Sequence, residues 1–251
     1  MLASAVTTVL AADSTAATDT PLPPRDYAVS AKAKDYIRNA VADPARTADE
    51  KTHDAYRMPA EVLQLANVKP GSRVVEFSAY GNYYSKMLVD IVGEKGELWM
   101  YDPPFADQVF GKQQQAFVAA HPNAHYSGTD WNRIELPKQV DVVTCFMCFH
   151  EQLATGTELS ALHSRLYKAM KPGAIYIVVF ANARSGTGTD DTGKTHRVED
   201  SVVRQNIIAG GFELVEENRI LNNRADPHTS QVFTDNQADL SDRTIYKFRK
   251  P

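Results

Sequence analysis

The sequence predicts an α/β fold with a mainly parallel, seven-stranded sheet, an antiparallel final strand and an N-terminal helical segment. Short apolar runs alternate with helical stretches of about 10 to 13 residues, the arrangement that right-handed βαβ crossovers produce. Two runs, 140–146 and 174–180, are apolar almost throughout, as in strands that helices cover on both faces. Of the 251 residues, 43% are hydrophobic and 23% charged, which is typical of one globular domain.

The composition also excludes several classes of function. The net charge of −4 argues against nucleic acid as the main partner, because phosphate binding requires a basic face. No apolar run reaches the roughly 20 residues that span a bilayer. Two cysteines are too few for a disulfide framework. We therefore expect a small-molecule substrate, no nucleic acid and no membrane span, and the oligomeric state stays open.

Residues 1–26 form a segment of different character. Residues 1–12 are small, apolar and uncharged, and Val9-Leu10-Ala11 is similar to the site that signal peptidase cleaves. A linker rich in Ser, Thr, Ala and Pro follows and is expected to be disordered. The first basic residue is Arg25, whereas an export signal begins with a basic region. Two interpretations stay open: the remnant of a signal peptide of a periplasmic protein, or a tail of a cytoplasmic one.

Residues 27–58 are expected to form an N-terminal helical cap, and residues 59–251 one α/β domain. Residues 27–42 carry apolar side chains at an uneven helical spacing, which Asp43-Pro44 ends. A further helix begins at Pro59, because proline suits the first helical turn. The cap either encloses a ligand on the domain or serves as an arm in a dimer.

Turn signals separate the elements of the α/β domain. Lys69-Pro70-Gly71, Lys171-Pro172-Gly173 and Gly210-Gly211 combine residues that end helices or reverse the chain. Between them we predict strands at residues 73–77, 97–101, 124–127, 140–146, 174–180, 212–220 and 244–248. We predict the main helices at residues 83–92, 107–120, 158–170 and 199–209. No helical pattern separates the last two strands, so we expect them to form an antiparallel hairpin at one edge.

Several pieces of the chain resemble class I S-adenosylmethionine-dependent methyltransferases over residues 59–251. These pieces are Val68-Lys69-Pro70-Gly71, Glu76, Asp102, Asp130 and Lys171-Pro172-Gly173. A narrower resemblance, to a bacterial family of predicted and often exported methyltransferases, rests on Pro59-Ala60-Glu61-Val62-Leu63, Gly81-Asn82-Tyr83-Tyr84, Phe149-His150-Glu151, His196-Arg197-Val198, Gly211-Phe212, Asp226-Pro227-His228 and Lys247-Phe248-Arg249-Lys250-Pro251. The resemblance implies a Rossmann-like domain, S-adenosyl-L-methionine as cofactor and a small-molecule methyl acceptor.

The resemblance implies a cofactor site at the carboxyl ends of the strands, where such sheets bind ligands. Its residues are Glu76, Ser78, Tyr80, Gly81, Asn82, Asp102, Asp130 and Trp131. Asp102 would accept hydrogen bonds from the ribose hydroxyls, and Asp130-Trp131 would meet the adenine. Alternatively, Asp102 is a solvated turn residue, Asp130 a helix cap and Trp131 a core aromatic.

Tyr80 is the main departure from the family pattern. Ser78, Tyr80 and Asn82 stand where the family has glycines, which let the backbone approach the cofactor closely. The Tyr80 ring would have to leave the space of the cofactor. Two interpretations follow: an altered site that still binds S-adenosylmethionine, or a repurposed, exported binding protein that has lost it.

Three loops carry candidate catalytic residues: His150, Glu151, His196 and His228. All three loops are expected near one rim of the sheet. If these side chains converge, a His or Glu can deprotonate the methyl acceptor. The alternative is a divalent-metal site formed by His150, His196 and His228 with a carboxylate, although the spacing matches no fixed metal motif. Each His alone is equally consistent with a surface or hydrogen-bonded loop residue.

Cys145 and Cys148 form a C-x-x-C pattern at the end of a predicted strand. On a strand, residues three apart point to opposite faces, so the pattern disfavours a disulfide or shared metal ligation. We therefore predict two buried thiols, of which Cys148 lies closer to the site. Free thiols are unusual in an exported protein, which weighs against the signal-peptide interpretation.

Overall fold

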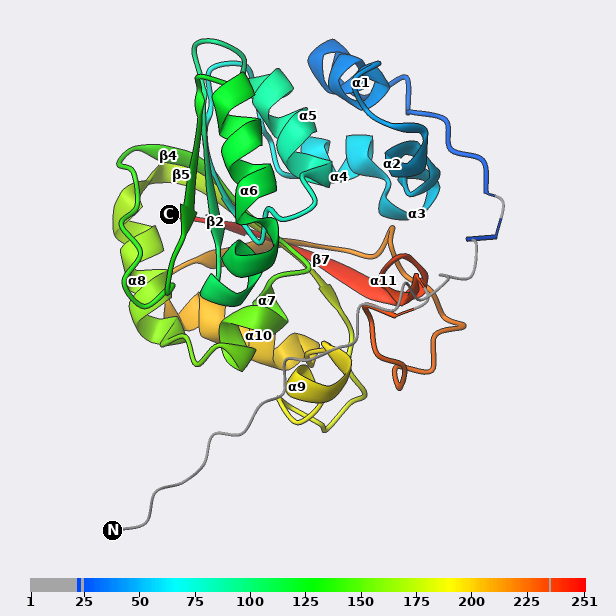
Figure 1. The fold of residues 1–251 in the computed structure, drawn as a ribbon. Helices are drawn as coiled ribbons and strands as arrows, with labels where there is room; N and C mark the ends of the chain where they lie inside the picture. The colour runs from blue at the N-terminus through cyan, green and yellow to red at the C-terminus, as the bar shows by residue number, and fades with distance from the viewer. Residues whose placement is uncertain (1–21, 24, 235) are drawn as a thin grey trace.

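A computed structural model describes residues 22–23, 25–234 and 236–251. It contains a seven-stranded sheet of order β3-β2-β1-β4-β5-β7-β6, shown in Figure 1. The strands are β1 (Arg73–Phe77), β2 (Glu97–Asp102), β3 (Ala124–Gly128), β4 (Val140–Phe146), β5 (Met170–Ala181), β6 (Glu213–Asn218) and β7 (Arg243–Arg249). Strands β1 to β5 are parallel, and β7 runs antiparallel to both β5 and β6. The predicted fold class is therefore confirmed.

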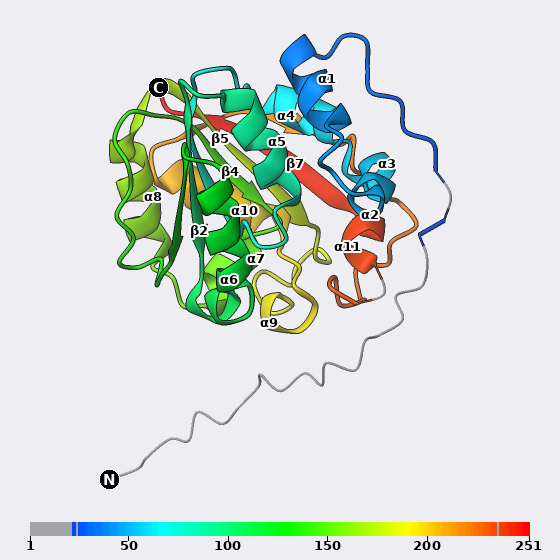
Figure 2. The same cartoon turned by 45° about the horizontal axis from the view of Figure 1, so that its top comes forward.

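Helices cover both faces of the sheet (Figure 2). They are α1 (Asp35–Ala42), α2 (Ala48–Thr52), α3 (Asp54–Arg57), α4 (Pro59–Leu65), α5 (Tyr83–Val92), α6 (Pro104–Ala120), α7 (Phe149–Ala154), α8 (Leu159–Ala169), α9 (Thr192–Thr195), α10 (Asp200–Ala209) and α11 (Gln237–Leu240). Successive strand side chains alternate between the faces. Val74 and Val142 therefore pack with α4 and α5, whereas Val75 and Val143 pack with α8 and α10. Burial on both faces explains why the central strands are apolar.

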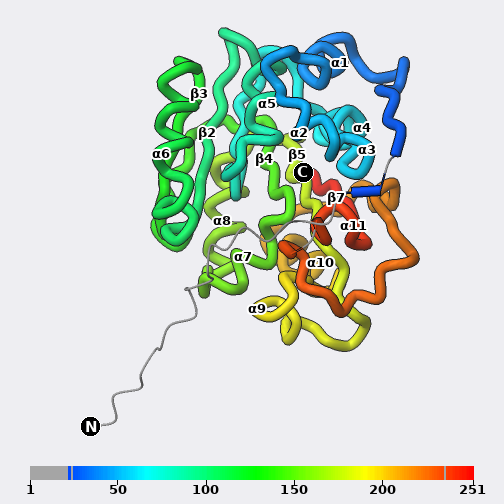
Figure 3. The backbone as a smooth tube through the Cα atoms, turned by 45° about the vertical axis from the view of Figure 1, so that its right-hand side comes forward, coloured from blue at the N-terminus to red at the C-terminus, as the bar shows by residue number. Residues whose placement is uncertain are grey.

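The N-terminal cap lies beside α5 and the beginning of β7 (Figure 3). Its regular structure begins at Asp35, later than the predicted start at Tyr27. A buried ion pair between Arg46 and Asp54 closes the segment between α1 and α3, and the Tyr83 hydroxyl of α5 donates to the same carboxylate. These contacts fix the cap against the carboxyl side of the sheet.

The closing strands pair as an antiparallel ribbon, with β6 at the edge and β7 inside the sheet. We expected no helix between these two strands, and this expectation was wrong, because α11 lies between β6 and β7 in the chain. α11 has only four residues, too few to give a helical pattern in the sequence. It contacts α3 of the cap, so this connection adds to the walls of the site.

Most of the expected export segment, residues 1–26, lies outside the described residues. Within the described part of the chain, no helix has the length and apolar character needed to cross a bilayer.

Candidate functional site

The carboxyl ends of the parallel strands meet at the point where the strand order reverses, between β1 and β4. Sheets of this type bind ligands there. A cavity of about 210 Å³ opens at this point. It is lined by Arg57, Glu76, Ser78, Ala79, Tyr80, Tyr83, Tyr84, Phe146, Met147, Val179, Phe233, Ala238, Asp239 and Arg243. We call this cavity the crevice.

The loop from β1 to α5 turns sharply through three left-handed residues. Ser78, Gly81 and Asn82 have φ values of 57°, 84° and 54°. Gly81 adopts such a φ without steric cost, and Asn tolerates it better than most residues. The loop thus makes the turn predicted for it with one glycine only.

Two buried carboxyl groups stand at the tips of neighbouring strands. Glu76 is 3% exposed and accepts a hydrogen bond from Ser85 Oγ at 2.7 Å. Burial raises the pKa of Glu76 to about 8, outweighing that hydrogen bond. Asp102 is fully buried and accepts from the Ala79 N–H at 2.7 Å and from Gln114 Nε2 at 3.2 Å. Burial raises the pKa of Asp102 to about 6, against the effect of both bonds.

Tyr80 reaches across the crevice from the β1–α5 loop. Its ring stacks on Phe110 of α6, with centroids 5.3 Å apart and planes 13° apart. Its hydroxyl donates to Oε1 of Glu151 on α7. The phenol therefore bridges the helices that follow β2 and β4.

The polar groups of the crevice suit S-adenosylmethionine, but the free volume of the crevice is small for it. Glu76 and Asp102 are buried at the carboxyl ends of β1 and β2, where the family resemblance implies contacts to the cofactor. However, both carboxylate oxygens of Asp102 already have partners, and Tyr80 lies over the strand tips. The remaining 210 Å³ is below the roughly 300–1,000 Å³ of ordinary small-molecule sites. The cofactor therefore fits only after Tyr80 has moved.

His150, Glu151 and His196 come together beside this crevice. His150 is 1% exposed, and its Nε2 has no hydrogen-bond partner and lies 3.8 Å from Glu151 Oε1. Burial, with a smaller effect of His196, lowers the pKa of His150 to about 3, so the imidazole is neutral. The two imidazole rings meet edge to face at 5.0 Å, and Phe233 packs against both.

Glu151 connects this cluster to the loop after β1. It accepts hydrogen bonds from Ser78 Oγ and from the Tyr80 hydroxyl. Burial raises the pKa of Glu151 to about 8, although the bond from Ser78 opposes the shift. A carboxyl group with such a pKa exchanges its proton near neutrality, as general acid–base chemistry requires.

His228 belongs to a different cluster. Its Nε2 lies 3.0 Å from Oδ2 of Asp242. The neighbouring Arg197 and Asp226 form a bidentate ion pair, with N···O distances of 2.7 and 3.1 Å. Within the described ranges, no group of three or more His, Cys, Asp or Glu side chains is arranged to hold a metal ion. The three predicted histidines thus do not form one ligand set.

Asp130 and Trp131 lie at the end of β3. The Asp130 side chain is 47% exposed and accepts from the Asn132 N–H. Trp131 is 1% exposed and packs edge to face on Phe77. Its ring is covered, so stacking on an adenine would require this packing to change.

Cys145 and Cys148 form a disulfide, with Cα atoms 5.2 Å apart. The prediction of two free thiols was therefore wrong. Cys148 is not on the strand: Met147 adopts a left-handed φ of 57° and reverses the chain, so Cys148 begins α7. The rule that strand residues three apart point to opposite faces does not apply across this turn. Because the two cysteines are not free thiols, the argument against export that rested on free thiols no longer applies.

Three charged residues of the crevice wall escaped the sequence analysis: Arg57, Asp239 and Arg243. They lie far apart in the chain, and no motif joins them. Arg57 Nε donates to Asp239 Oδ1 at 2.6 Å, and Arg243 Nη2 donates to the carbonyl oxygens of Asp239 and Tyr56 at 2.9 and 2.8 Å. Only the fold brings the cap, α11 and β7 together at this place.

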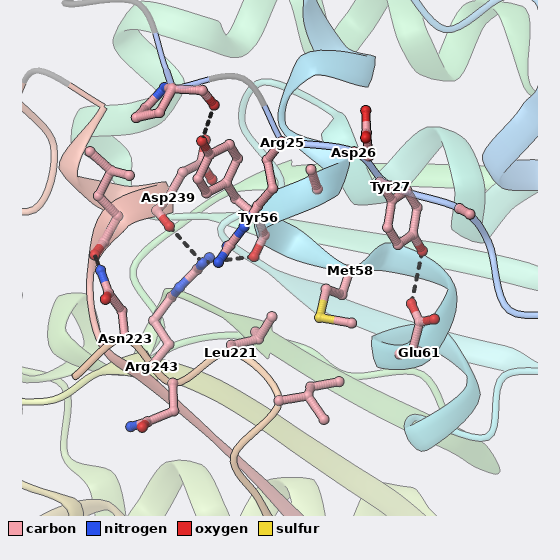
Figure 4. A pocket seen from close by; sticks show the side chains of 16 residues that line it. Arg25, Asp26, Tyr27, Tyr56, Met58, Glu61, Leu221, Asn223, Asp239 and Arg243 are labelled. Carbon is pink, nitrogen blue, oxygen red and sulfur yellow. Dashed lines mark hydrogen bonds between the residues drawn. The ribbon is translucent and has the colours of Figure 1, made fainter. Parts of the chain in front are cut away.

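A second cavity, of about 580 Å³, lies on the other side of Arg243 and Asp239. We call it the outer cavity. The cap and the connection between β6 and β7 line it. Figure 4 shows Arg243 pointing toward Tyr56 and Asp239 on one side, with Tyr27 and Glu61 on the other. Arg243 and Asp239 line both cavities and therefore lie at the boundary between them.

Comparison with solved structures relates the chain to methyltransferases. A SAM-dependent methyltransferase from Aquifex aeolicus superposes with a TM-score of 0.57 at 17% identity, over 80% of this chain and 96% of that one. A putative methyltransferase from Haloferax volcanii gives 0.57 at 14% identity, over 86% and 98%. Geranyl diphosphate C-methyltransferase from Streptomyces coelicolor, solved with S-adenosyl-L-homocysteine, gives 0.58 at 13% identity, over 85% and 84%.

No protein-family model and no curated protein matches the sequence. At these identities the structural likeness establishes the Rossmann-like methyltransferase fold. A fold does not fix a reaction, so the function is argued from the site.

Proposed function

We propose that this protein is an S-adenosylmethionine-dependent methyltransferase of a small molecule, and that Tyr80 occupies the nucleoside site until the cofactor displaces it. One observation carries the proposal. Glu76 and Asp102 are carboxyl groups with almost no exposure, and burial raises the pKa of each. Burying a carboxyl group costs stability, and such groups concentrate at functional sites. Their position at the tips of β1 and β2 suits the methionine and ribose portions of the cofactor.

Glu151 is the proposed general base. A bound S-adenosylmethionine supplies an electrophilic methyl group, and the protein must position the acceptor and remove its proton. Glu151 lies beside the crevice, and its raised pKa lets it hold or release a proton near neutral pH. The neutral His150, with its unpaired Nε2, is placed to orient the acceptor. His196 covers one side of this pair.

Titration with S-adenosylhomocysteine tests the proposal. We expect the ligand to raise the melting temperature of the wild-type protein, and Tyr80→Gly to tighten binding about tenfold, because the closed conformer no longer competes. Tyr80→Phe should give a smaller gain, since the ring still stacks on Phe110 while the bond to Glu151 is lost. Asp102→Asn in the Tyr80→Gly background should weaken binding.

A second candidate function is a binding protein on this fold that has lost the cofactor. The small free volume of the crevice and the two partners of Asp102 favour it. If Tyr80→Gly shows no response to millimolar S-adenosylhomocysteine, the second candidate replaces the first. Weaker binding by Tyr80→Gly would show that Tyr80 is a cofactor contact and not an occupant of its site.

A further inference from the structure

Arg243 is a buried cation that has no carboxylate partner among the described residues. Arg243 is the first residue of β7 and is 4% exposed. Its Nη2 donates to two carbonyl oxygens, those of Tyr56 and Asp239, and its Nε has no partner. Among the described residues, no Asp or Glu oxygen lies within ion-pair distance of it. A guanidinium stays charged in proteins, so burying it without an anion is costly.

The nearest carboxylate is already used. Asp239 accepts from Arg57 Nε at 2.6 Å and Nη2 at 3.4 Å, and its Oδ2 also contacts His53 Nδ1. Tyr83 and Tyr84, which also line the crevice, are neutral at ordinary pH because burial raises the pKa of both. Among the described residues, the guanidinium groups of Arg57 and Arg243 therefore share one carboxylate at the boundary between the cavities, which leaves an excess of positive charge there.

The carboxylates of the outer cavity do not remove this excess. Glu61 accepts the Tyr27 hydroxyl at 2.8 Å across the cavity from Arg243, as Figure 4 shows, and Asp26 is exposed at the rim. Neither forms an ion pair with Arg243. The outer cavity is also lined by a second arginine, Arg25, and by Asn222 and Asn223, whereas Met58 and Leu221 give it an apolar portion. In the crevice, Tyr84, Phe146 and Phe233 supply apolar and aromatic surface.

We infer that Arg243 anchors a small molecule with one carboxylate and an apolar or aromatic body, which enters through the outer cavity and extends into the crevice. A monoanion supplies the negative charge that Arg243 lacks, and the Nε, which has no partner among the described residues, is a donor that such an anion can accept from. The outer cavity of about 580 Å³ has the size of ordinary small-molecule sites. This inference names the substrate class of the proposed methyltransferase and in that respect rests on the proposed function. Carboxylate binding itself does not require the cofactor.

Ligand-observed fluorine NMR tests the inference on the full chain without cofactor. The probe is 4-fluorobenzoate, and 4-fluorobenzamide is its uncharged counterpart. We expect the benzoate signal to broaden with the wild-type protein and the benzamide signal to stay sharp. Arg243→Met should abolish the broadening. Arg249→Met is the matched control: Arg249 ends the same strand, is half exposed and pairs with Glu213, so this variant should bind as the wild type does.

A conservative variant covers the case in which Arg243→Met does not fold. Arg243→Lys keeps the charge but loses the Nε donor, and we expect it to weaken fluorobenzoate binding roughly tenfold. Equal broadening of both probes, no broadening of the benzoate, or wild-type affinity in Arg243→Lys would overturn the inference. Displacement of the benzoate by an equal concentration of inorganic phosphate would reassign the site to phosphate esters. A failed titration with S-adenosylhomocysteine would leave this result unchanged, so the two proposals fail separately.

Discussion

Glu76 links the candidate site to the pH dependence of stability. Its pKa is about 8 in the folded protein, against 4.5 for an ordinary glutamate. Between these values the unfolded chain releases the proton and the folded protein keeps it. The free energy of unfolding should therefore fall as pH rises from about 5 to 8, by at most about 1.4 kcal/mol per pH unit for this group, and level off above the folded pKa.

Glu76→Gln isolates this effect, because glutamine keeps the shape and does not ionise. Urea unfolding of both proteins at pH 5, 6, 7 and 8 is the measurement. The stability of the variant relative to the wild type should increase with pH across this range. Glu151 has a similarly raised pKa and remains in both proteins, so it cancels in the difference. Parallel pH curves would mean that Glu76 is ionised in the folded state.

At the scale of single residues, local chemistry could be read from the sequence and long-range pairing could not. Tyr80 stands out in the sequence, because the chain of this fold turns sharply after β1 and a large side chain is unexpected there. No sequence pattern connects Arg243 with Arg57, since the two are 186 residues apart and both have ordinary neighbours. Trp131 adjoins a candidate site in the sequence, yet its ring packs against Phe77.

At the scale of elements, burial on both faces made the central strands predictable. Strand β4 begins and ends at the predicted residues, and α5 does also, because Gly93 ends it. The short helices α7, α9 and α11 were missed, because four to six residues do not establish a helical period. Missing α7 led directly to the error over Cys148, since the turn at Met147 was read as a continuation of the strand.

The disulfide joins the end of β4 to the start of α7, the helix that carries His150 and Glu151. We expect the protein, denatured without reductant, to resist alkylation at both cysteines and to gain two alkyl groups after reduction. Mass spectrometry measures both states. Replacing both cysteines by alanine should lower the free energy of unfolding by about 2 kcal/mol, the loop-closure value for so short a loop. Two alkylated cysteines without reduction would show that the bond does not form.

At the scale of the whole molecule, the cap is held on two sides of the site, by contacts with α5 and with α11. Arg46 and Asp54 hold it to Tyr83 of α5, while His53 and Arg57 hold it to Asp239 of α11. A segment that precedes the α/β domain therefore contacts the segment that precedes the last strand of that domain. The crevice exists as a walled cavity because of this second connection, which no local pattern in the sequence predicts.

Asp239 is the centre of that connection, so Asp239→Asn tests it. Burial alone would raise the pKa of Asp239, but the hydrogen bond from His53 and the charge of Arg57 hold it at about 2. The variant leaves the Arg57 guanidinium without its carboxylate partner, which should cost about 3 kcal/mol of stability. Hydrogen exchange measured by mass spectrometry should speed up together in residues 48–57 and 237–243, while β1 and β4 stay protected.

Asp35→Asn is the matched control, because Asp35 is an exposed carboxylate of the same cap that forms an ion pair with Arg38. It should leave exchange in both segments unchanged. Faster exchange confined to residues 237–240 in Asp239→Asn would mean that α11 merely frays and that the cap is held by its contacts with α5 alone. Faster exchange in both segments together would instead show that they unfold as one cooperative unit. A ligand bound to Arg243 would stabilise that unit, because Arg243 donates to both Tyr56 and Asp239.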